Sequence, residues 1–247
     1  VLIKMRFNGK KALVTGAAGG IGKSLVRKLR AEGASVAVTD INVSHIEAEA
    51  HFPGDLSVAQ FCDDLPIKTR DVLGSLDILI NNAGIIRRGK VTQATDDDFK
   101  STMAVNIEAP FRLCRSTIPI MAANGGGSIV NTASCWGLNP GPDHPIYIMS
   151  KAALASFTQC LGRDHAHQNI RVNAVCPNEV NTPMIRSGFS IRGLDPDKAI
   201  EELNETVPLG RIAEPDDISD VILFLASDEA RYMCGSLVEV NGGKPVS

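Results

Sequence analysis

The sequence contains no long apolar run and no block of like charges. No apolar stretch approaches the roughly 20 residues that a helix needs to cross a bilayer, and the formal net charge is only −3. These features argue against a membrane protein and against binding to nucleic acid or a charged membrane surface. The first residues, Val1–Met5, lack the apolar core and cleavage site of a signal peptide, so we expect a cytoplasmic protein.

Closely spaced cysteines are also absent. The six cysteines are scattered, with no C-x-x-C pair, and most of them lie in apolar stretches. This distribution predicts free, buried thiols and neither disulfides nor a zinc site. His165 and His167 are two residues apart, so their side chains would diverge on a helix. We therefore expect no metal site.

The sequence does contain a regular alternation of short β-branched runs and helical patterns. Its 247 residues, of which 44% are hydrophobic, suffice for one large α/β domain with a sizeable core. No linker or repeat interrupts the alternation, which favours a parallel sheet with helices on both faces. The clearest strands are expected at residues 11–15, 35–39, 76–80, 128–132, 170–175 and 237–240.

Two stretches between these strands are less regular. Residues 96–123 form one long helical pattern, which Pro110 is expected to kink or split because proline lacks an N–H group. Residues 182–206 are polar and mixed, and are the part of the chain that is least recognisable as core. A last helix is expected from Glu214 to Ala226, with a proline and acidic residues in its first turn.

A glycine-rich turn, Thr15–Gly22, connects the first expected strand to a helix, and the next strand ends at Asp40. A strand, glycine turn, helix, strand and acid within about 30 residues is the context in which such a turn binds a dinucleotide. The glycines let the backbone approach a pyrophosphate, and the helix N-terminus supplies N–H donors. Asp40 is placed to accept hydrogen bonds from the hydroxyls of an adenosine ribose.

Tyr147 and Lys151 are four residues apart in another helical pattern, so their side chains share one face. A nearby fixed cation lowers the pKa of a phenol from its usual value of about 10, and a tyrosine can then act as a general acid/base. Alone, such a pair has little specificity. Polar and glycine residues at the ends of other strands add to it, because ligands of parallel sheets bind beyond these ends. Gly16, Asp40, Asn82, Ser134 and Pro177 should therefore line one cleft.

These motifs resemble those of the classical short-chain dehydrogenase/reductase family over essentially the whole chain. The matching residues are Thr15-Gly16-x-x-x-Gly20-x-Gly22, Asn81-Asn82-Ala83-Gly84, Asn106, Ser134, Tyr147-x-x-x-Lys151, and Pro177 leading to Thr182. The resemblance implies a single Rossmann-fold domain over residues 1–247, with a doubly wound parallel sheet of about seven strands. It also implies a lead-in at 1–8 and a substrate loop or lid at 182–206.

The resemblance implies roles for individual residues. Tyr147 would exchange a proton with the substrate hydroxyl, and Lys151 would lower the pKa of Tyr147 and bind the nicotinamide ribose. Ser134 would bind the substrate oxygen, and Asn106 would hold a water molecule of a proton relay. The expected cofactor-binding residues are Gly16, Gly19, Gly20, Ile21, Gly22, Asp40, Asp55, Leu56, Asn82, Ala83, Gly84, Tyr147, Lys151, Pro177, Val180 and Thr182.

The expected cofactor is NAD, because Asp40 would repel the 2′-phosphate of NADP. Gly19 also stands where NADP-using relatives often carry a basic residue. The enzyme would then interconvert a secondary alcohol and a ketone by hydride transfer. A 3-oxoacyl reductase and a non-catalytic dinucleotide-binding protein are the alternatives.

The substrate is less constrained. The chain has Pro177-Asn178 where the family usually has Pro-Gly, so Asn178 and the following Glu179 are either specificity residues or part of a solvated loop. Arg87, Arg88 or Arg186 could anchor a carboxylate, although Arg87 and Arg88 could equally be solvated or bind a neighbouring subunit. A small hydroxy acid of the sugar-acid type is the expected substrate. A neutral polyol or hydroxyketone is the alternative. The candidate substrate-binding residues are Ser134, Trp136, His144, Asn178, Glu179 and Arg186.

The expected partners are the small-molecule substrate and further copies of the chain. The helix from Ile146 to His165 and the terminal strand with Gly242-Gly243 resemble surfaces through which relatives form tetramers. Closed homo-oligomers are the common outcome of such surfaces. We expect a homotetramer or a dimer, and no nucleic-acid or membrane partner.

Overall fold

The structure is a computed structural model that describes residues 5–244. Residues 1–4, which include most of the segment assessed as a signal peptide and half of the expected lead-in, lie outside the described residues. Seven strands form one sheet: β1 Lys11–Thr15, β2 Ser35–Asp40, β3 Ala50–Pro53, β4 Ile78–Asn81, β5 Gly127–Thr132, β6 Ile170–Pro177 and β7 Leu237–Val240.

All neighbouring strands in this sheet are parallel. Their order is β3-β2-β1-β4-β5-β6-β7, so the chain builds outward from β1 to one edge and then returns to build the other half. The point where the order reverses lies between β1 and β4, which is where ligands bind in doubly wound sheets. The predicted doubly wound parallel fold is confirmed.

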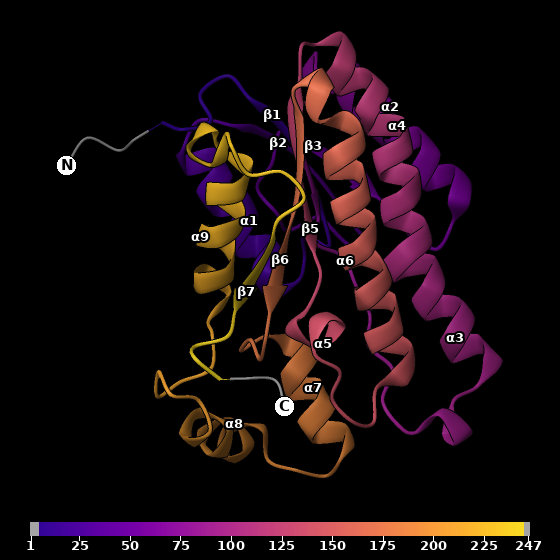
Figure 1. Cartoon of the computed structure of the whole chain (residues 1–247), viewed down its shortest axis with the longest axis vertical. Helices are drawn as coiled ribbons and strands as arrows, with labels where there is room; N and C mark the ends of the chain where they lie inside the picture. The colour runs from indigo at the N-terminus through magenta and orange to yellow at the C-terminus, as the bar shows by residue number, and fades with distance from the viewer. Residues whose placement is uncertain (1–4, 245–247) are drawn as a thin grey trace.

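Helices cover both faces of the sheet, as the alternating pattern predicts (Figure 1). α1 and α9 lie on one face, and α2, α4 and α6 lie on the other, while α5, α7 and α8 lie beyond the carboxyl ends of the strands. The helices are α1 Gly20–Ala31, α2 Ala59–Leu73, α3 Asp96–Met103, α4 Ala109–Ala123, α5 Cys135–Leu138, α6 Pro145–His165, α7 Pro183–Ile191, α8 Pro196–Glu205 and α9 Pro215–Ala226.

The sheet separates two hydrophobic clusters. In β1, Ala12 and Val14 pack with Leu25 of α1 and Ile222 of α9, whereas Leu13 packs into the other cluster, among residues of α2 and α4. Successive side chains of a strand point to opposite faces. Because the strand is covered on both sides, its three central residues are all apolar, as is usual in parallel strands.

The long helical stretch expected at 96–123 is divided in two. A π-helical turn, Ala104–Glu108, separates α3 from α4, and Pro110 lies in the first turn of α4. Proline cannot donate the hydrogen bond that an uninterrupted helix requires. Single π turns are often found at functional sites, and this one carries the fully buried Asn106.

Residues 182–206, the stretch that is least recognisable as core in the sequence, are mostly helical. They form α7 and α8, each with a proline in its first turn. Phe189, Ala199 and Ile200 pack there with Val207 and Ile212 in a separate small cluster.

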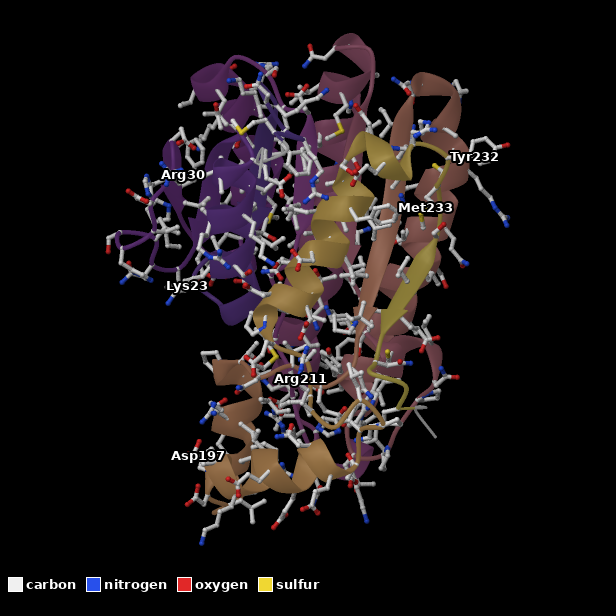
Figure 2. The ribbon with its side chains drawn as sticks, turned by 90° about the vertical axis from the view of Figure 1, so that its left-hand side faces the viewer. Lys23, Arg30, Asp197, Arg211, Tyr232 and Met233 are labelled. Atoms are coloured by element: carbon white, nitrogen blue, oxygen red, sulfur yellow. The ribbon has the colours of Figure 1, made fainter. Side chains whose placement is uncertain are left out.

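Figure 2 shows Asp197 of α8 at the lower end of the molecule and Tyr232 projecting near the upper end. The structure also forms a helical turn, α5, at the start of the glycine- and proline-rich loop that precedes Tyr147.

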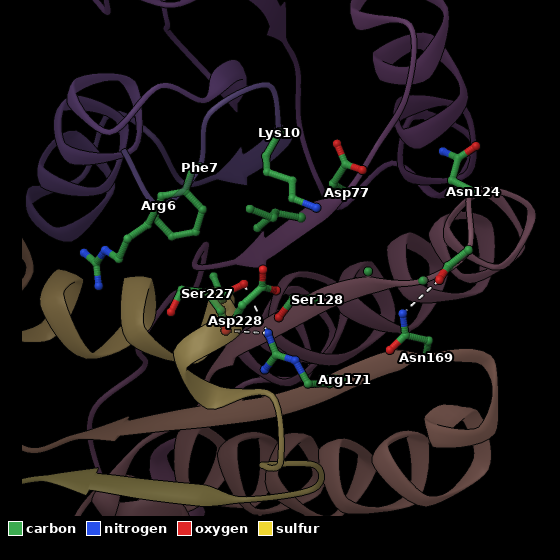
Figure 3. A pocket seen from close by; sticks show the side chains of 15 residues that line it. Arg6, Phe7, Lys10, Asp77, Asn124, Ser128, Asn169, Arg171, Ser227 and Asp228 are labelled. Atoms are coloured by element: carbon green, nitrogen blue, oxygen red, sulfur yellow. Dashed lines mark hydrogen bonds between the residues drawn. The ribbon is translucent and has the colours of Figure 1, made fainter. Parts of the chain in front are cut away.

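A polar cavity of about 160 Å³ lies at the amino ends of the strands, opposite the predicted cleft (Figure 3). Arg171, one of its charged residues, donates to the carbonyl oxygens of Leu225, Ala226, Ser227 and Ala230. The side chain therefore supplies hydrogen-bond donors to the carbonyl groups at and just beyond the carboxyl end of α9, which lack partners within the helix. This role in fastening the helix accounts for the presence of Arg171 in the cavity.

All six cysteines are free, and four of them are buried, whereas Cys160 and Cys234 are exposed. Among residues 5–244, no group of three or more histidine, cysteine or acidic side chains is arranged to hold a metal ion. None of the described helices has both the length and the apolar character needed to cross a membrane.

Candidate active site

The turn after β1 is fastened to the end of β4. The Thr15 hydroxyl accepts hydrogen bonds from the backbone N–H groups of Asn82 and Ala83, both at 3.1 Å. The Asn82 side chain donates to the carbonyl oxygens of Thr15 and Gly16, also at 3.1 Å. Gly16 has a φ of +65°, and a Cβ at this position would lie 2.8 Å from the Cα of Ala83. Only glycine combines this conformation with such a close approach.

The rest of the glycine turn leaves the N-terminus of α1 open. No side chain caps it, and its first turn contains no acidic residue, so its N–H groups remain available to an anion. A Cβ on Gly22 would collide with the Gly16 carbonyl oxygen, and one on Gly20 would lie 2.9 Å from Cγ2 of Thr182. Gly19 is the extended residue before the helix, and Ile21 packs against the core.

Asp40 lies directly beside this turn. Its carboxylate accepts hydrogen bonds from the backbone N–H groups of Ala18 at 3.0 Å and Ile41 at 2.7 Å. These bonds hold a negative charge at the end of β2 with lone pairs left for a ligand. The other expected adenosine-side residues differ in exposure: Asp55 is exposed and accepts from the Ser57 N–H at 2.8 Å, whereas Leu56 is buried.

Asn106, Gly84 and Lys151 meet beneath the ends of β4 and β5. The Asn106 side chain accepts from the Ile85 N–H and donates to the Ile85 carbonyl oxygen, both at 2.9 Å, and donates to the Ser150 hydroxyl at 3.0 Å. A Cβ on Gly84 would lie 3.3 Å from Lys151 Nζ and 3.5 Å from Asn106 Oδ1. Both amide hydrogens of Asn106 are thus engaged, and Oδ1 retains one lone pair for a water molecule.

Lys151 is a buried cation. Only 3% of its surface is exposed, and its Nζ donates to the Thr132 carbonyl oxygen at 2.6 Å. Burial lowers the pKa of Lys151 to about 8, because removal from water disfavours the charged form.

Tyr147 lies one helical turn before Lys151, whose Nζ is 5.8 Å from the centre of the tyrosine ring. Burial raises the pKa of Tyr147, while a hydrogen bond with the Ser134 side chain and the charge of Arg88 act in the lowering direction. The net shift of this pKa is upward, and the role of Lys151 in lowering it stays a prediction. Desolvation of the phenol dominates, and the ammonium of Lys151 is directed to Thr132.

Ser134 is positioned by the turn of α5. Its Oγ accepts from the Trp136 N–H at 3.2 Å and donates to the Pro177 carbonyl oxygen at 3.5 Å. The latter bond joins the ends of β5 and β6. Beyond Pro177, Val180 forms an isolated bridge with Ala213, and the Thr182 hydroxyl donates to the Val180 carbonyl oxygen at 3.3 Å.

The expected substrate residues are only partly brought together. The Trp136 and His144 rings form an edge-to-face pair with centres 4.7 Å apart, close to Ser134. Glu179 instead forms an ion pair with Lys244 at 2.8 Å, and Arg186 forms one with Asp197 at 2.7 Å. Neither side chain is a free charge facing the substrate.

Asn178 donates its backbone N–H to the Val240 carbonyl oxygen at 3.1 Å, which ties it to the end of β7. Sequence analysis missed Arg192, whose positive charge contributes to lowering the pKa of both Arg88 and His144. Its position after α7 gives no signal in the sequence, because only the packing of α7 brings it to the cleft.

Comparison with known proteins agrees with this geometry. Residues 16–244 match the family described as enoyl-(acyl carrier protein) reductase. An uncharacterised oxidoreductase of Thermotoga maritima is 37% identical, covering 97% of this chain and 98% of the relative. The 3-oxoacyl-(acyl-carrier-protein) reductase of the same organism is 36% identical over 97% of this chain and 99% of its own.

A solved structure is similar as well. The ligand-free aldohexose dehydrogenase of Thermoplasma acidophilum superposes with a TM-score of 0.93 at 28% identity, covering 99% of this chain and 97% of that one. The sheet order, the glycine turn and the grouping of Ser134, Tyr147 and Lys151 thus occur together with sequence similarity over nearly the whole chain. The chain belongs to the classical short-chain dehydrogenase/reductase family.

Proposed function

We propose that the protein oxidises a secondary alcohol to a ketone, reversibly, with NAD as the hydride acceptor. One observation carries the proposal: Tyr147, Ser134 and Lys151 converge at the carboxyl ends of the strands, beside a glycine turn that leaves the N-terminus of α1 open. Family membership supports an oxidoreductase that acts on CH–OH groups with a nicotinamide cofactor. The preference for NAD and the substrate class belong to the proposal.

The side chains divide the chemistry among them. In the oxidation direction, the Tyr147 phenolate accepts the hydroxyl proton while the C–H electron pair leaves carbon as hydride. Bound NAD supplies the acceptor for this hydride. Ser134 donates a hydrogen bond to the oxygen that becomes the ketone, and Lys151 keeps a positive charge in a site with little water. In the reverse direction, Tyr147 returns the proton.

Several observations support a dinucleotide in this cleft. The open N-terminus of α1 suits a pyrophosphate, and Asp40 is held in place by two backbone N–H groups. The residues that would hold the adenosine half and the pyrophosphate are Gly16, Gly19, Gly20, Ile21, Gly22, Asp40, Asp55 and Leu56. Those that would hold the nicotinamide half are Asn82, Ala83, Gly84, Tyr147, Lys151, Pro177, Val180 and Thr182.

Asp40 is expected to give a preference for NAD of roughly 10²-fold or more in kcat/KM. Two like charges about 4 Å apart near a protein surface repel by about 4 kcal/mol, and about 1.4 kcal/mol corresponds to tenfold. Asp40→Ala should reduce the preference by at least about tenfold. Asp40→Asn keeps an acceptor for the Ala18 N–H and isolates the effect of charge. Equal efficiency with NADP in the unchanged protein would contradict the assignment.

The same assay tests the second candidate function. A relative named 3-oxoacyl-(acyl-carrier-protein) reductase is 36% identical, so this activity is a specific alternative. Faster reduction of a 3-oxoacyl thioester with NADPH than oxidation of any alcohol with NAD would favour it. The absence of turnover with all alcohols and ketones would instead favour a non-catalytic dinucleotide-binding protein.

We propose a small polar hydroxy acid as substrate, with a neutral polyol or hydroxyketone as the alternative. The structural relative named aldohexose dehydrogenase supports a polyhydroxylated substrate. Trp136 and His144 provide one wall with both apolar and polar character. Which of the two classes fits depends on the charges around Tyr147.

We also propose that the protein forms a closed homo-oligomer, either a tetramer or a dimer. Phe111 of α4 and Met149 of α6 are exposed, and Phe111 lies 6.1 Å from the Phe157 ring of α6. Exposed apolar side chains on adjacent helices favour burial against a second copy. Light scattering should give two or four times the chain mass of 26.3 kDa. A monomer at micromolar concentration would count against this assembly.

A further inference from the structure

Arg88 is held between α7 and the loop that precedes α6. Its Nη2 donates to the Met184 carbonyl oxygen at 3.2 Å. A Cβ on Gly188, one helical turn later, would collide with the same guanidinium, so Arg88 occupies the space that a side chain would fill. The adjacent Gly89 donates its N–H to the Asp143 carbonyl oxygen at 2.7 Å. The loop that carries Arg88 is therefore attached both to α7 and to the loop before α6.

Arg192 reaches the same turn of α7 from its other end. Its Nε donates to the Gly188 carbonyl oxygen at 3.1 Å. Its guanidinium carbon lies 5.0 Å from the centre of the Phe189 ring, which provides a platform for the cation. Two guanidinium groups that are far apart in the sequence thus meet around the backbone of Gly188.

No carboxylate neutralises this pair within residues 5–244. The neighbouring Arg87 is 3.1 Å from Asp98, and Arg186 is 2.7 Å from Asp197, whereas neither Arg88 nor Arg192 forms an ion pair there. Of the arginines considered from the sequence, Arg88 therefore remains without an ion pair in the described chain, and Arg192 joins it.

Charge interactions connect Arg88 and Arg192 to Tyr147, the residue that is proposed to exchange the proton. Partial burial lowers the pKa of Arg88, and the charge of Arg192 lowers it further. Burial is also the main cause that lowers the pKa of His144, with smaller contributions from both arginines. Arg88 in turn lowers the pKa of Tyr147. An anion bound here would relieve the repulsion between the two cations while lying in the same cleft as Tyr147.

We propose that Arg88 and Arg192 bind the carboxylate of an acidic substrate whose hydroxyl group reacts at Tyr147. Guanidinium groups match the planar geometry of a carboxylate and bind it through paired, charge-assisted hydrogen bonds. This inference rests on the proposed dehydrogenase function and specifies its substrate class. A neutral polyol leaves both cations uncompensated and therefore binds more weakly.

The sequence contains one tryptophan, Trp136, and its ring lies 4.7 Å from that of His144. Its fluorescence therefore reports occupancy of the cleft. The NAD-loaded protein is titrated with matched pairs: gluconate and glucitol, and 3-hydroxybutanoate and butane-1,3-diol. NADH formation is measured with the same four compounds. The acidic member of a pair should bind at least about tenfold more tightly than its neutral partner.

Variants then locate the carboxylate site. Arg88→Gln and Arg192→Gln should each raise Kd for the acid by about 10- to 100-fold and change that of the neutral partner by less than about threefold. Arg88→Lys should restore part of the loss. Gly188→Ala displaces the Arg88 guanidinium without removing its charge, and should raise Kd for the acid by about 3- to 10-fold. Arg70→Gln, on the distant helix α2, controls for the loss of one exposed positive charge.

The outcomes separate this inference from the proposed function. Equal binding of both members in every pair, or an equal loss for both in Arg88→Gln, overturns the carboxylate site and leaves the dehydrogenase intact. A carboxylate-dependent fluorescence change without NADH formation supports the site but contradicts the proposed function. Tighter acid binding that Arg88→Gln and Gly188→Ala both weaken supports the inference.

Discussion

Replacement of Tyr147 by phenylalanine is expected to lower kcat by about 10²- to 10⁴-fold, which is the usual contribution of a positioned acid/base. The variant keeps the ring in its half-buried position and removes only the hydroxyl group that is proposed to exchange the proton. Cofactor affinity, measured by fluorescence titration with NADH, should change by less than about threefold. Unchanged turnover would remove Tyr147 from the mechanism.

The pH dependence of the unchanged protein provides a second readout of the same residue. Because burial raises the pKa of Tyr147, its base form is scarce at neutral pH. The rate of alcohol oxidation should therefore increase as the pH rises above 7, and the residual activity of Tyr147→Phe should lack this increase. The sequence contains one other tyrosine, the fully exposed Tyr232, near the upper end of the molecule (Figure 2). Tyr232→Phe is thus a matched control that should retain full activity.

The fold could be predicted because its determinants are local. The centre of β1 is apolar, and the strand is followed by glycine at the points where the backbone approaches Ala83 and Thr182. Such a strand and turn can be recognised from residue type and spacing. The carboxyl ends of parallel strands share one edge, so the sequence also indicated that Asp40, Asn82 and Ser134 belong to one cleft.

The contacts that tune the site could not be predicted in the same way. Asp197 neutralises Arg186, whereas Arg192 has no ion pair in the described chain. The direction of the Tyr147 pKa depends on how much water its phenol loses, and spacing along a helix contains no such information. Asn106 similarly depends on a π turn that forms between two helices.

Replacement of Lys151 by methionine is expected to stabilise the protein and to remove most of its activity. Burial lowers the pKa of Lys151 from 10.5 to about 8, which corresponds to a cost of about 3 kcal/mol for keeping the ammonium charged at neutral pH. Its hydrogen bond to the Thr132 carbonyl oxygen returns about 1.5–3 kcal/mol, because the donor is charged. Methionine has a similar length and no charge, so unfolding at pH 7 should require up to about 1.5 kcal/mol more, a rise in Tm of a few degrees.

The pH dependence of the stability gain distinguishes the desolvation of Lys151 from a general change in core packing. Between about pH 8 and 10.5 the unfolded chain binds a proton at Lys151 that the folded chain has lost, so the stability of the unchanged protein increases with pH in this range. The advantage of Lys151→Met should therefore shrink as the pH rises from 8 to 10. Lys100→Met, at an exposed position on α3, should show no such trend.

The accompanying loss of activity tests whether the buried charge serves catalysis. Lys151→Met removes the cation beneath Tyr147, and kcat/KM for alcohol oxidation should fall by at least about 10²-fold. Greater stability together with lost activity would show that the fold tolerates a destabilising charge because the reaction needs it. A lower Tm at pH 7 would show instead that the bond from Lys151 to Thr132 contributes more than desolvation costs, and this account of the buried ammonium would be wrong.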